Sequence, residues 1–255
     1  MMCFPLPKGV IKKISALCRL FLWTSGEEIN RKSPVEWKNV CKKRNKGGLD
    51  MTDLHLWNMA IILRLLWNLS QKENSMWAKW VHAYHLNKQS LMEVNIKDRF
   101  SWIIKKILLQ RNKVAQMQET WDNMQGKGKF SMKKTYDCMD GDDVQVHWKA
   151  LMYKNDARPR AIMTLWLTCH KKLATKDRLK RFGMIAHDDY SMCDKNETIN
   201  HLFYERVKMK EIWCKVLEWI HIMHEPKGWN EELEWLVGKC NKKSWKTELQ
   251  KLAAT

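Results

Sequence analysis

Apolar residues recur every three or four positions along much of this chain, and that spacing constrains its fold more than any other feature. The clearest apolar stripe consists of Leu54, Trp57, Ile61, Leu65 and Leu69. The 255 residues include 10 Gly and 5 Pro, too few for a turn-rich all-β fold. The sequence therefore predicts a mainly α protein. The tryptophans that fall on such stripes are predicted to be buried, and they include Trp57, Trp166 and Trp213.

The helical spacing is lost between Asp122 and Phe130, where the sequence DNMQGKGKF contains two glycines. Glycine together with lost periodicity indicates a connection, so we expect two small helical units. The second unit is expected to open with a short strand over 130–133. The predicted divisions are a helical connector region over 1–121, a linker over 122–129, a second unit over 130–222 and a C-terminal helical tail over 223–255.

Local signals mark two helices of the second unit. Pro159 suits the first turn of a helix that runs through His170, because proline lacks the N–H that this position leaves unused. Thr175 reads as the N-cap of the next helix, KDRLKRF. Gly183 follows that helix where a left-handed residue often ends one.

The first ten residues, MMCFPLPKGV, contain two prolines and do not resemble a secretory signal. The longest apolar stretch, 59–69, is about half as long as the roughly 20 residues of a membrane helix and contains Arg64. The eight cysteines are widely spaced, as in a reduced protein. We therefore expect an intracellular protein, in the nucleus or cytoplasm, with no membrane segment.

Positive charge exceeds what solubility requires: 46 Lys+Arg against 28 Asp+Glu give a net charge of +18. Much of it falls in two stretches, which contain Lys42, Lys43, Arg44, Lys46, Lys171, Lys172, Lys176, Arg178, Lys180 and Arg181. Such stretches bind phosphates in a sequence-independent and salt-sensitive way, so RNA or DNA is the expected partner. A second interpretation stays open, in which these charges only solvate helix faces.

Two stretches of the second unit resemble a known family. PRAIMTLWLTCHKKLATKDRLKRFGM (159–184), followed by CDKNETINHLFYERVKMKEIW (193–213), resembles the zinc-binding domain that follows the polymerase in plant LINE-type, non-LTR retrotransposon reverse transcriptases. Upstream, 6–23 and 35–69 resemble the segment that links the polymerase to that domain. The resemblance covers about 5–220, in the family's order.

The resemblance implies a zinc site with the pattern C-x2-C, a short spacer, E-T-x2-H and x4-C, whose four donors can surround zinc tetrahedrally. Cys193 and His201 occupy two of these positions, after alignment on Glu197-Thr198. Tyr190 and Arg206 stand at the other two, and a guanidinium cannot lose its proton to become a ligand. We therefore expect a zinc-knuckle-like loop that is degenerate and binds zinc weakly or not at all, although replacement donors stay possible.

The family's polymerase and endonuclease would precede this region. A polymerase needs a Tyr-x-Asp-Asp turn that holds metal ions, and neither Asp142-Asp143 nor Asp188-Asp189 has the required tyrosine two residues upstream. We assign no catalytic residues and expect that the chain is not an enzyme. A retroelement polymerase acting in trans would have to supply an active site.

Two functions remain as hypotheses. The first is a non-catalytic remnant of a retrotransposon reverse transcriptase that binds RNA or DNA weakly and without sequence preference. The second is a structural or decayed retroelement product with no retained activity. Binding of single-stranded RNA at low salt distinguishes them, because only the first predicts it.

Overall fold

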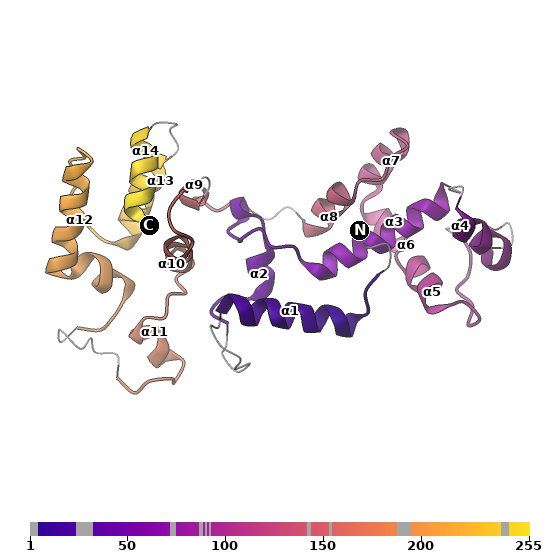
Figure 1. Ribbon diagram of the computed structural model, residues 1–255, viewed down its shortest axis with the longest axis horizontal. Coiled ribbons are helices and arrows are strands. Elements are labelled where there is room, and N and C mark those ends of the chain that lie inside the picture. The colour runs from indigo at the N-terminus through magenta and orange to yellow at the C-terminus, as the bar shows by residue number, and fades with distance from the viewer. Residues whose placement is uncertain are drawn as a thin grey trace. The chain divides into compact units, whose positions relative to one another are not determined.

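The chain forms two compact units in the computed structural model, shown in Figure 1. Unit 1 consists of 1–31 and 52–143, and unit 2 of 32–51 and 144–255. The structure describes residues 5–23, 33–71, 75–86, 89, 91, 93–141, 144–152, 155–187, 195–240 and 245–255. Every regular element in these ranges is helical, which confirms the mainly α prediction.

Unit 1 contains α1 (Lys8–Trp23), α3 (Leu54–Ser70), α4 (Met76–Val81), the π-helical turn η2 (His82–Leu86), α5 (Trp102–Leu109), α6 (Arg111–Gln116), α7 (Gln118–Gly126) and α8 (Met132–Asp140). Helix α3 is its centre, because α1, α4, α5 and α8 all contact it. Asp53 caps the start of α3, where its carboxylate accepts a hydrogen bond of 2.7 Å from the His55 amide.

More residues of α3 are buried than the predicted apolar stripe contains. Ile61 and Leu69 are buried as expected, and so are Leu63 and Leu66, which the stripe left out. Neighbouring helices cover α3 on several sides, so no single face is reserved for solvent along most of its length. Trp57, in contrast, is 38% exposed and lies 6.1 Å from Tyr136 between ring centroids, so its predicted burial is wrong.

The predicted linker and strand both fall on ordered helical structure. Residues 122–126 form the end of α7, in which Trp121 and Met124 are buried. The Trp121 ring meets Trp67 edge-on, with centroids 5.1 Å apart, and this contact fastens α7 to the core of unit 1. The strand expected over 130–133 is wrong: Ser131 caps α8 with its hydroxyl, and the helix begins at Met132.

Unit 2 contains α2 (Trp37–Cys41), the 3₁₀ turn η1 (Arg44–Lys46), α9 (Lys149–Met152), α10 (Pro159–Cys169), α11 (Lys176–Arg181), the π-helical turn η3 (His201–Glu205), α12 (Val207–Trp219), α13 (Trp229–Cys240) and α14 (Trp245–Ala254). Helix α10 begins at Pro159, as the sequence predicts, and buries Leu165 and Trp166. Of the zinc-knuckle-like loop expected over 190–206, residues 190–194 lie outside the described residues, and His201–Glu205 form the helical turn η3.

The C-terminal helices belong to the core of unit 2. Helix α13 contacts α9 and α14, and its Leu233, Leu236 and Cys240 are buried. Burial raises the pKa of the Cys240 thiol to about 11. The segment 223–255, expected as a separate tail, therefore supplies part of the core of unit 2.

No helix in the described ranges is both long enough and apolar enough to cross a lipid bilayer.

Candidate nucleic-acid interface

The first basic stretch leads into a tight turn that only glycine can complete. A Cβ at position 48 would lie 1.9 Å from the backbone oxygen of Lys42, a distance that no side chain tolerates. Gly47 has φ +85°, a left-handed conformation, and a Cβ there would lie 3.0 Å from Val146. The sequence KKRNKGG is thus a folded turn in which Gly48 donates a hydrogen bond of 3.0 Å to the Lys43 carbonyl.

This turn docks onto α10 through one carbonyl group. The oxygen of Gly47 accepts a hydrogen bond of 2.9 Å from the indole N–H of Trp166 and lies 2.7 Å from Nε2 of His170. Because a carbonyl oxygen only accepts, Nε2 of His170 must carry a proton. Trp166 and His170 are four residues apart, so they face the turn from one side of the helix. Trp166 is fully buried, which protects the contact from water.

The two basic stretches meet around His170. Burial is the main cause that lowers the pKa of this histidine, and the hydrogen bond to Gly47 opposes that effect. The charges of Lys172 and Lys42 lower the pKa further. The charges of two lysines far apart in the sequence therefore act on the same imidazole.

Helix α10 ends in a left-handed residue, Lys171, at which the second basic stretch begins. Lys171 has φ +55°, and its amide donates a hydrogen bond of 2.8 Å to Thr168. The Lys172 amide donates one of 2.8 Å to Leu167, which completes a C-terminal cap usually built with glycine. Both lysine side chains are exposed as a result.

Helix α11 is anchored at its start by Glu197. The Glu197 carboxylate accepts a hydrogen bond of 3.2 Å from the Lys176 amide, and the Glu197 backbone oxygen accepts one of 3.3 Å from the Asp177 amide. Thr175 is buried at the N-cap position, as predicted, although its hydroxyl donates to Asp177 and not to the backbone. Gly183 has φ +67° just after the helix, which confirms the predicted left-handed ending.

The ten basic residues differ in their exposure to solvent and in their bonds to other protein groups. Arg178 donates to the backbone oxygens of Lys172 and Pro34, the latter at 3.3 Å, so it joins the second stretch to the segment that precedes α2. Arg181 pairs with Asp177 at 2.7 Å. The exposed members are Arg44, Lys171, Lys172, Lys180 and Arg181, and the half-buried members are Lys42, Lys43, Lys46, Lys176 and Arg178. All ten belong to unit 2.

The Glu-Thr pair of the zinc motif has a structural role. The Thr198 hydroxyl accepts a hydrogen bond of 3.1 Å from the His201 amide, and the Thr198 carbonyl accepts one of 2.9 Å from the Leu202 amide. Thr198 therefore caps the helical turn that follows. Glu197 meanwhile holds the start of α11. The pair therefore joins the basic helix to the turn that carries the motif's histidine.

His201 is 3% exposed, and its Nδ1 lies 3.7 Å from a carboxylate oxygen of Glu205. Arg206, at the fourth ligand position, precedes α12 and accepts the Lys210 amide on its backbone oxygen at 2.8 Å. Cys193 and Tyr190 lie outside the described residues. Within the described ranges no three His, Cys, Asp or Glu side chains group as metal ligands.

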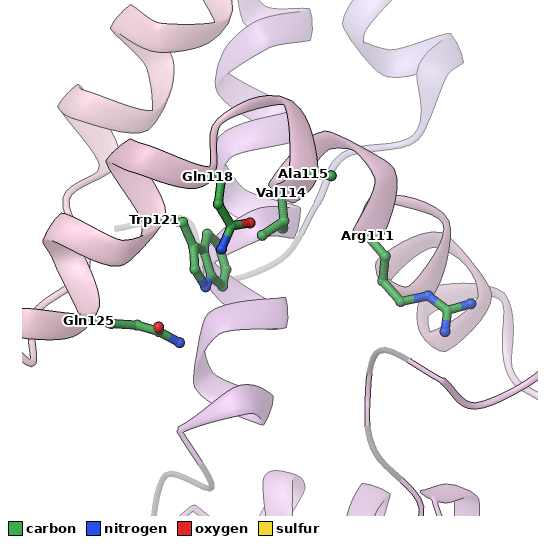
Figure 2. Close-up of a pocket in the computed structure, with 6 residues that line it drawn as sticks. All are labelled: Arg111, Val114, Ala115, Gln118, Trp121 and Gln125. Atoms are coloured by element: carbon green, nitrogen blue, oxygen red, sulfur yellow. The ribbon is translucent and has the colours of Figure 1, made fainter.

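Two cavities differ in their relation to the basic surface. One, of about 420 Å³, lies in unit 2 beside the turn, and its lining residues include Arg44, Gly48, Met163 and Trp166. The second, of about 280 Å³, lies in unit 1; Figure 2 shows that its lining residues are Arg111, Val114, Ala115, Gln118, Trp121 and Gln125. The Arg111 guanidinium donates to the carbonyls of Leu108 and Val94 at 2.9 Å each, which makes it a structural group.

Comparison with known proteins identifies the domain. Residues 130–213 match the family described as zinc-binding in reverse transcriptase. For these residues the match confirms the resemblance to a reverse-transcriptase zinc-binding domain that the sequence shows. The match runs from α8 of unit 1 to α12 of unit 2, so its limits do not coincide with either compact unit.

Two relatives from Arabidopsis thaliana are similar to parts of the chain. A protein named "Putative ribonuclease H protein" is 32% identical over 84 residues, which cover 32% of this chain and 14% of the relative. An uncharacterized mitochondrial protein is 28% identical over 109 residues, or 42% of this chain and 71% of the relative. The chain thus spans only about a seventh of the first relative (14%). No solved structure is significantly similar to it.

The docking of Gly47 on Trp166 and His170 is the functional feature that sequence reasoning missed. The glycine pair after KKRNK predicts only a turn, and the apolar stripe that contains Trp166 predicts only burial of that residue. The signal present in the sequence was the pairing of Trp166 with His170 four residues later, two side-chain N–H groups on one helix face. Their acceptor, 119 residues away, could not be identified without the structure.

Proposed function

We propose that unit 2 binds RNA or DNA through the phosphate backbone, using the basic surface formed by the turn 42–48 and the segment 171–181. The observation that carries this proposal is the contact of the turn 42–48 with the end of α10, next to Lys171 and Lys172. Hydrogen bonds from Trp166 and His170 to the Gly47 carbonyl hold the turn in place. A rigid array of ammonium groups binds a polyanion with less loss of side-chain and backbone entropy than a flexible one.

Such binding is weak, tolerant of sequence and sensitive to salt, because its driving force is the release of counterions from phosphates. None of the ten basic residues offers a rigid arrangement for reading base edges, and Arg178 and Arg181 are engaged with protein groups. The proposed role is therefore to hold a nucleic acid in place without selecting its sequence.

The test replaces Lys171 by Gly and Lys172 by Gln and measures the affinity for a fluorescent oligouridylate at low salt. Lys171→Gly removes a charge while relieving the left-handed backbone strain, so the fold is retained. The matched control is Lys133→Gln with Lys134→Gln, which removes two exposed charges from α8 in unit 1. Affinity is expected to fall severalfold in the first variant and much less in the control. Equal losses, or absence of binding by the unaltered protein, would refute the proposal.

We further propose that this domain keeps its fold without a tightly held zinc ion. Arg206 brings a fixed positive charge to a ligand position, and Tyr190 replaces a thiolate, so most of the roughly 10–16 kcal/mol of a four-ligand site is lost. Restoring both ligands by Tyr190→Cys with Arg206→Cys is expected to create zinc binding that native mass spectrometry detects. One zinc held tightly by the unaltered chain would contradict this proposal.

The match to the family described as zinc-binding in reverse transcriptase, together with the similarity to a protein named as a putative ribonuclease H, supports a wider interpretation, in which the chain is a non-catalytic remnant of a LINE-type reverse transcriptase. Any reverse transcription would then depend on a retroelement polymerase in trans. The second candidate is a decayed product without activity, and Arg206 at a ligand position favours it. A broad, non-cooperative thermal transition would support decay, whereas a cooperative transition unchanged by a chelator would support a folded binding module.

A further inference from the structure

Unit 1 presents an aromatic ring to solvent on a helix whose other face is well buried. Ile104, Ile107 and Leu108 of α5 are buried in the core. Trp102, the first residue of that helix, is 55% exposed. Large aromatic side chains gain most of their stabilisation from burial, so the core of unit 1 gives little reason for a tryptophan here.

Positive charge surrounds this ring. The ammonium of Lys106, one helical turn after Trp102, lies 3.8 Å from the ring centroid, in a cation–π contact. Lys8 of α1 is close enough to act on it: burial and the charge of Lys8 both lower the pKa of Lys106. Lys105 lies beside them in sequence and pairs with Asp98 at 3.7 Å.

We propose that Trp102, Lys106 and Lys8 form a stacking site for a single-stranded nucleic acid, in which a base lies on the exposed indole and a neighbouring phosphate meets the two ammonium groups. This inference rests on the proposed function, since it assumes that the chain meets nucleic acid. It adds a second contact, in the other compact unit and with a different chemistry.

The chemistry of the site favours a nucleotide over other anions. A base offers a flat π-face that can stack on the indole, and the phosphate next to it carries a negative charge that attracts the two ammonium groups. An acidic peptide supplies the charge without the ring. In a duplex the bases are stacked on each other, so their faces are closed to Trp102. The site therefore predicts a preference for single strands, which phosphate contacts alone do not give.

The experiment compares Trp102→Ala with Tyr84→Ala, both measured for affinity to an oligouridylate and to a duplex of matched length. Tyr84 is the control because it is an aromatic residue of the same unit and is 69% exposed. Trp102→Ala is expected to weaken single-strand binding roughly fivefold or more and to leave duplex binding nearly unchanged. Trp102→Phe, which keeps a ring, should recover part of the affinity.

A second measurement uses the unaltered protein. An oligonucleotide that contains 5-iodouridine is photo-crosslinked to the chain, and mass spectrometry identifies the modified residue, which is expected to be Trp102. If Trp102→Ala weakened the binding of an acidic peptide and not the binding of RNA, the inference would be overturned in favour of a protein partner. Wild-type binding that Trp102→Ala does not change, with no crosslink at Trp102, would refute the stacking site but leave unit 2 as the binding surface. No binding of either nucleic acid would refute both.

Discussion

At the residue scale, the structure depends on glycine where the backbone approaches itself. The Lys42 oxygen occupies the space that a Cβ at Gly48 would need, 1.9 Å away. Because the atom in the way belongs to the backbone, no side-chain rearrangement can relieve the clash. The turn must open, and the basic groups that it carries lose their position.

Gly48→Ala is therefore expected to reduce the free energy of unfolding of unit 2 by about 3 kcal/mol. Gly238→Ala is the matched control in the same unit: it lies within α13, a new Cβ there meets nothing within 4 Å, and alanine should stabilise the helix by about 0.5–1 kcal/mol. Urea denaturation of the two variants checks both signs. A Gly48→Ala protein as stable as the wild type would contradict the turn geometry.

His170 gives the fold a pH dependence. Its pKa in the folded protein is lowered, mainly by burial, so the unfolded chain takes up a proton first as the pH falls. Its contribution to stability is therefore complete above the ordinary histidine pKa of about 6.5 and is lost as the pH falls below it. His170→Gln keeps an N–H donor for the Gly47 carbonyl without titrating.

The free energy of unfolding should fall between about pH 7 and pH 5 in the wild type, and less steeply in His170→Gln. Denaturant titrations at the two pH values measure the difference. Parallel decreases in the two proteins would show that His170 does not contribute.

At the scale of elements, short signals predicted helix ends well. Pro159, Thr175 and Gly183 all stand at the boundaries that their chemistry favours, because capping depends only on residues nearby in the chain. The linker prediction for 122–129 rested on lost helical spacing and two glycines, but Trp121 and Met124 pack the start of that segment against the core. Such burial depends on distant partners, which periodicity alone does not reveal.

The capping role of Thr198 provides a test at this scale. Thr198→Ala removes the acceptor for the His201 amide and should cost about 1 kcal/mol of stability, whereas Thr198→Ser keeps the hydroxyl and should cost much less. Thermal unfolding monitored by circular dichroism ranks the variants. The cap would be ruled out as a source of stability if serine and alanine were equally destabilising.

At the scale of the whole molecule, the sequence predicted the class of fold and the zinc-binding domain but not the division of the chain. Unit 2 combines 32–51 with 144–255, so a segment far upstream completes the packing around α10. Local patterns treat the chain as consecutive domains and cannot predict a unit assembled from two separated segments. The same long-range assembly brings the two basic stretches together.

The net charge of +18 makes nucleic-acid affinity a property of the molecule as well as of one surface. General attraction by that charge would respond to the removal of any lysine. A defined surface responds most strongly to residues near His170. Comparison of variants in both basic stretches therefore separates the two explanations.

The most direct test of the central claim, that turn 42–48 and segment 171–181 act as one phosphate-binding surface, is the salt dependence of RNA affinity. The slope of log affinity against log salt concentration is measured for wild type, Arg44→Gln, Lys172→Gln and the double variant. Each single substitution should reduce the slope by about 0.7, the value for one phosphate on a single strand, and the double variant by about 1.4. Unchanged slopes, or a change confined to one of the two stretches, would contradict the account.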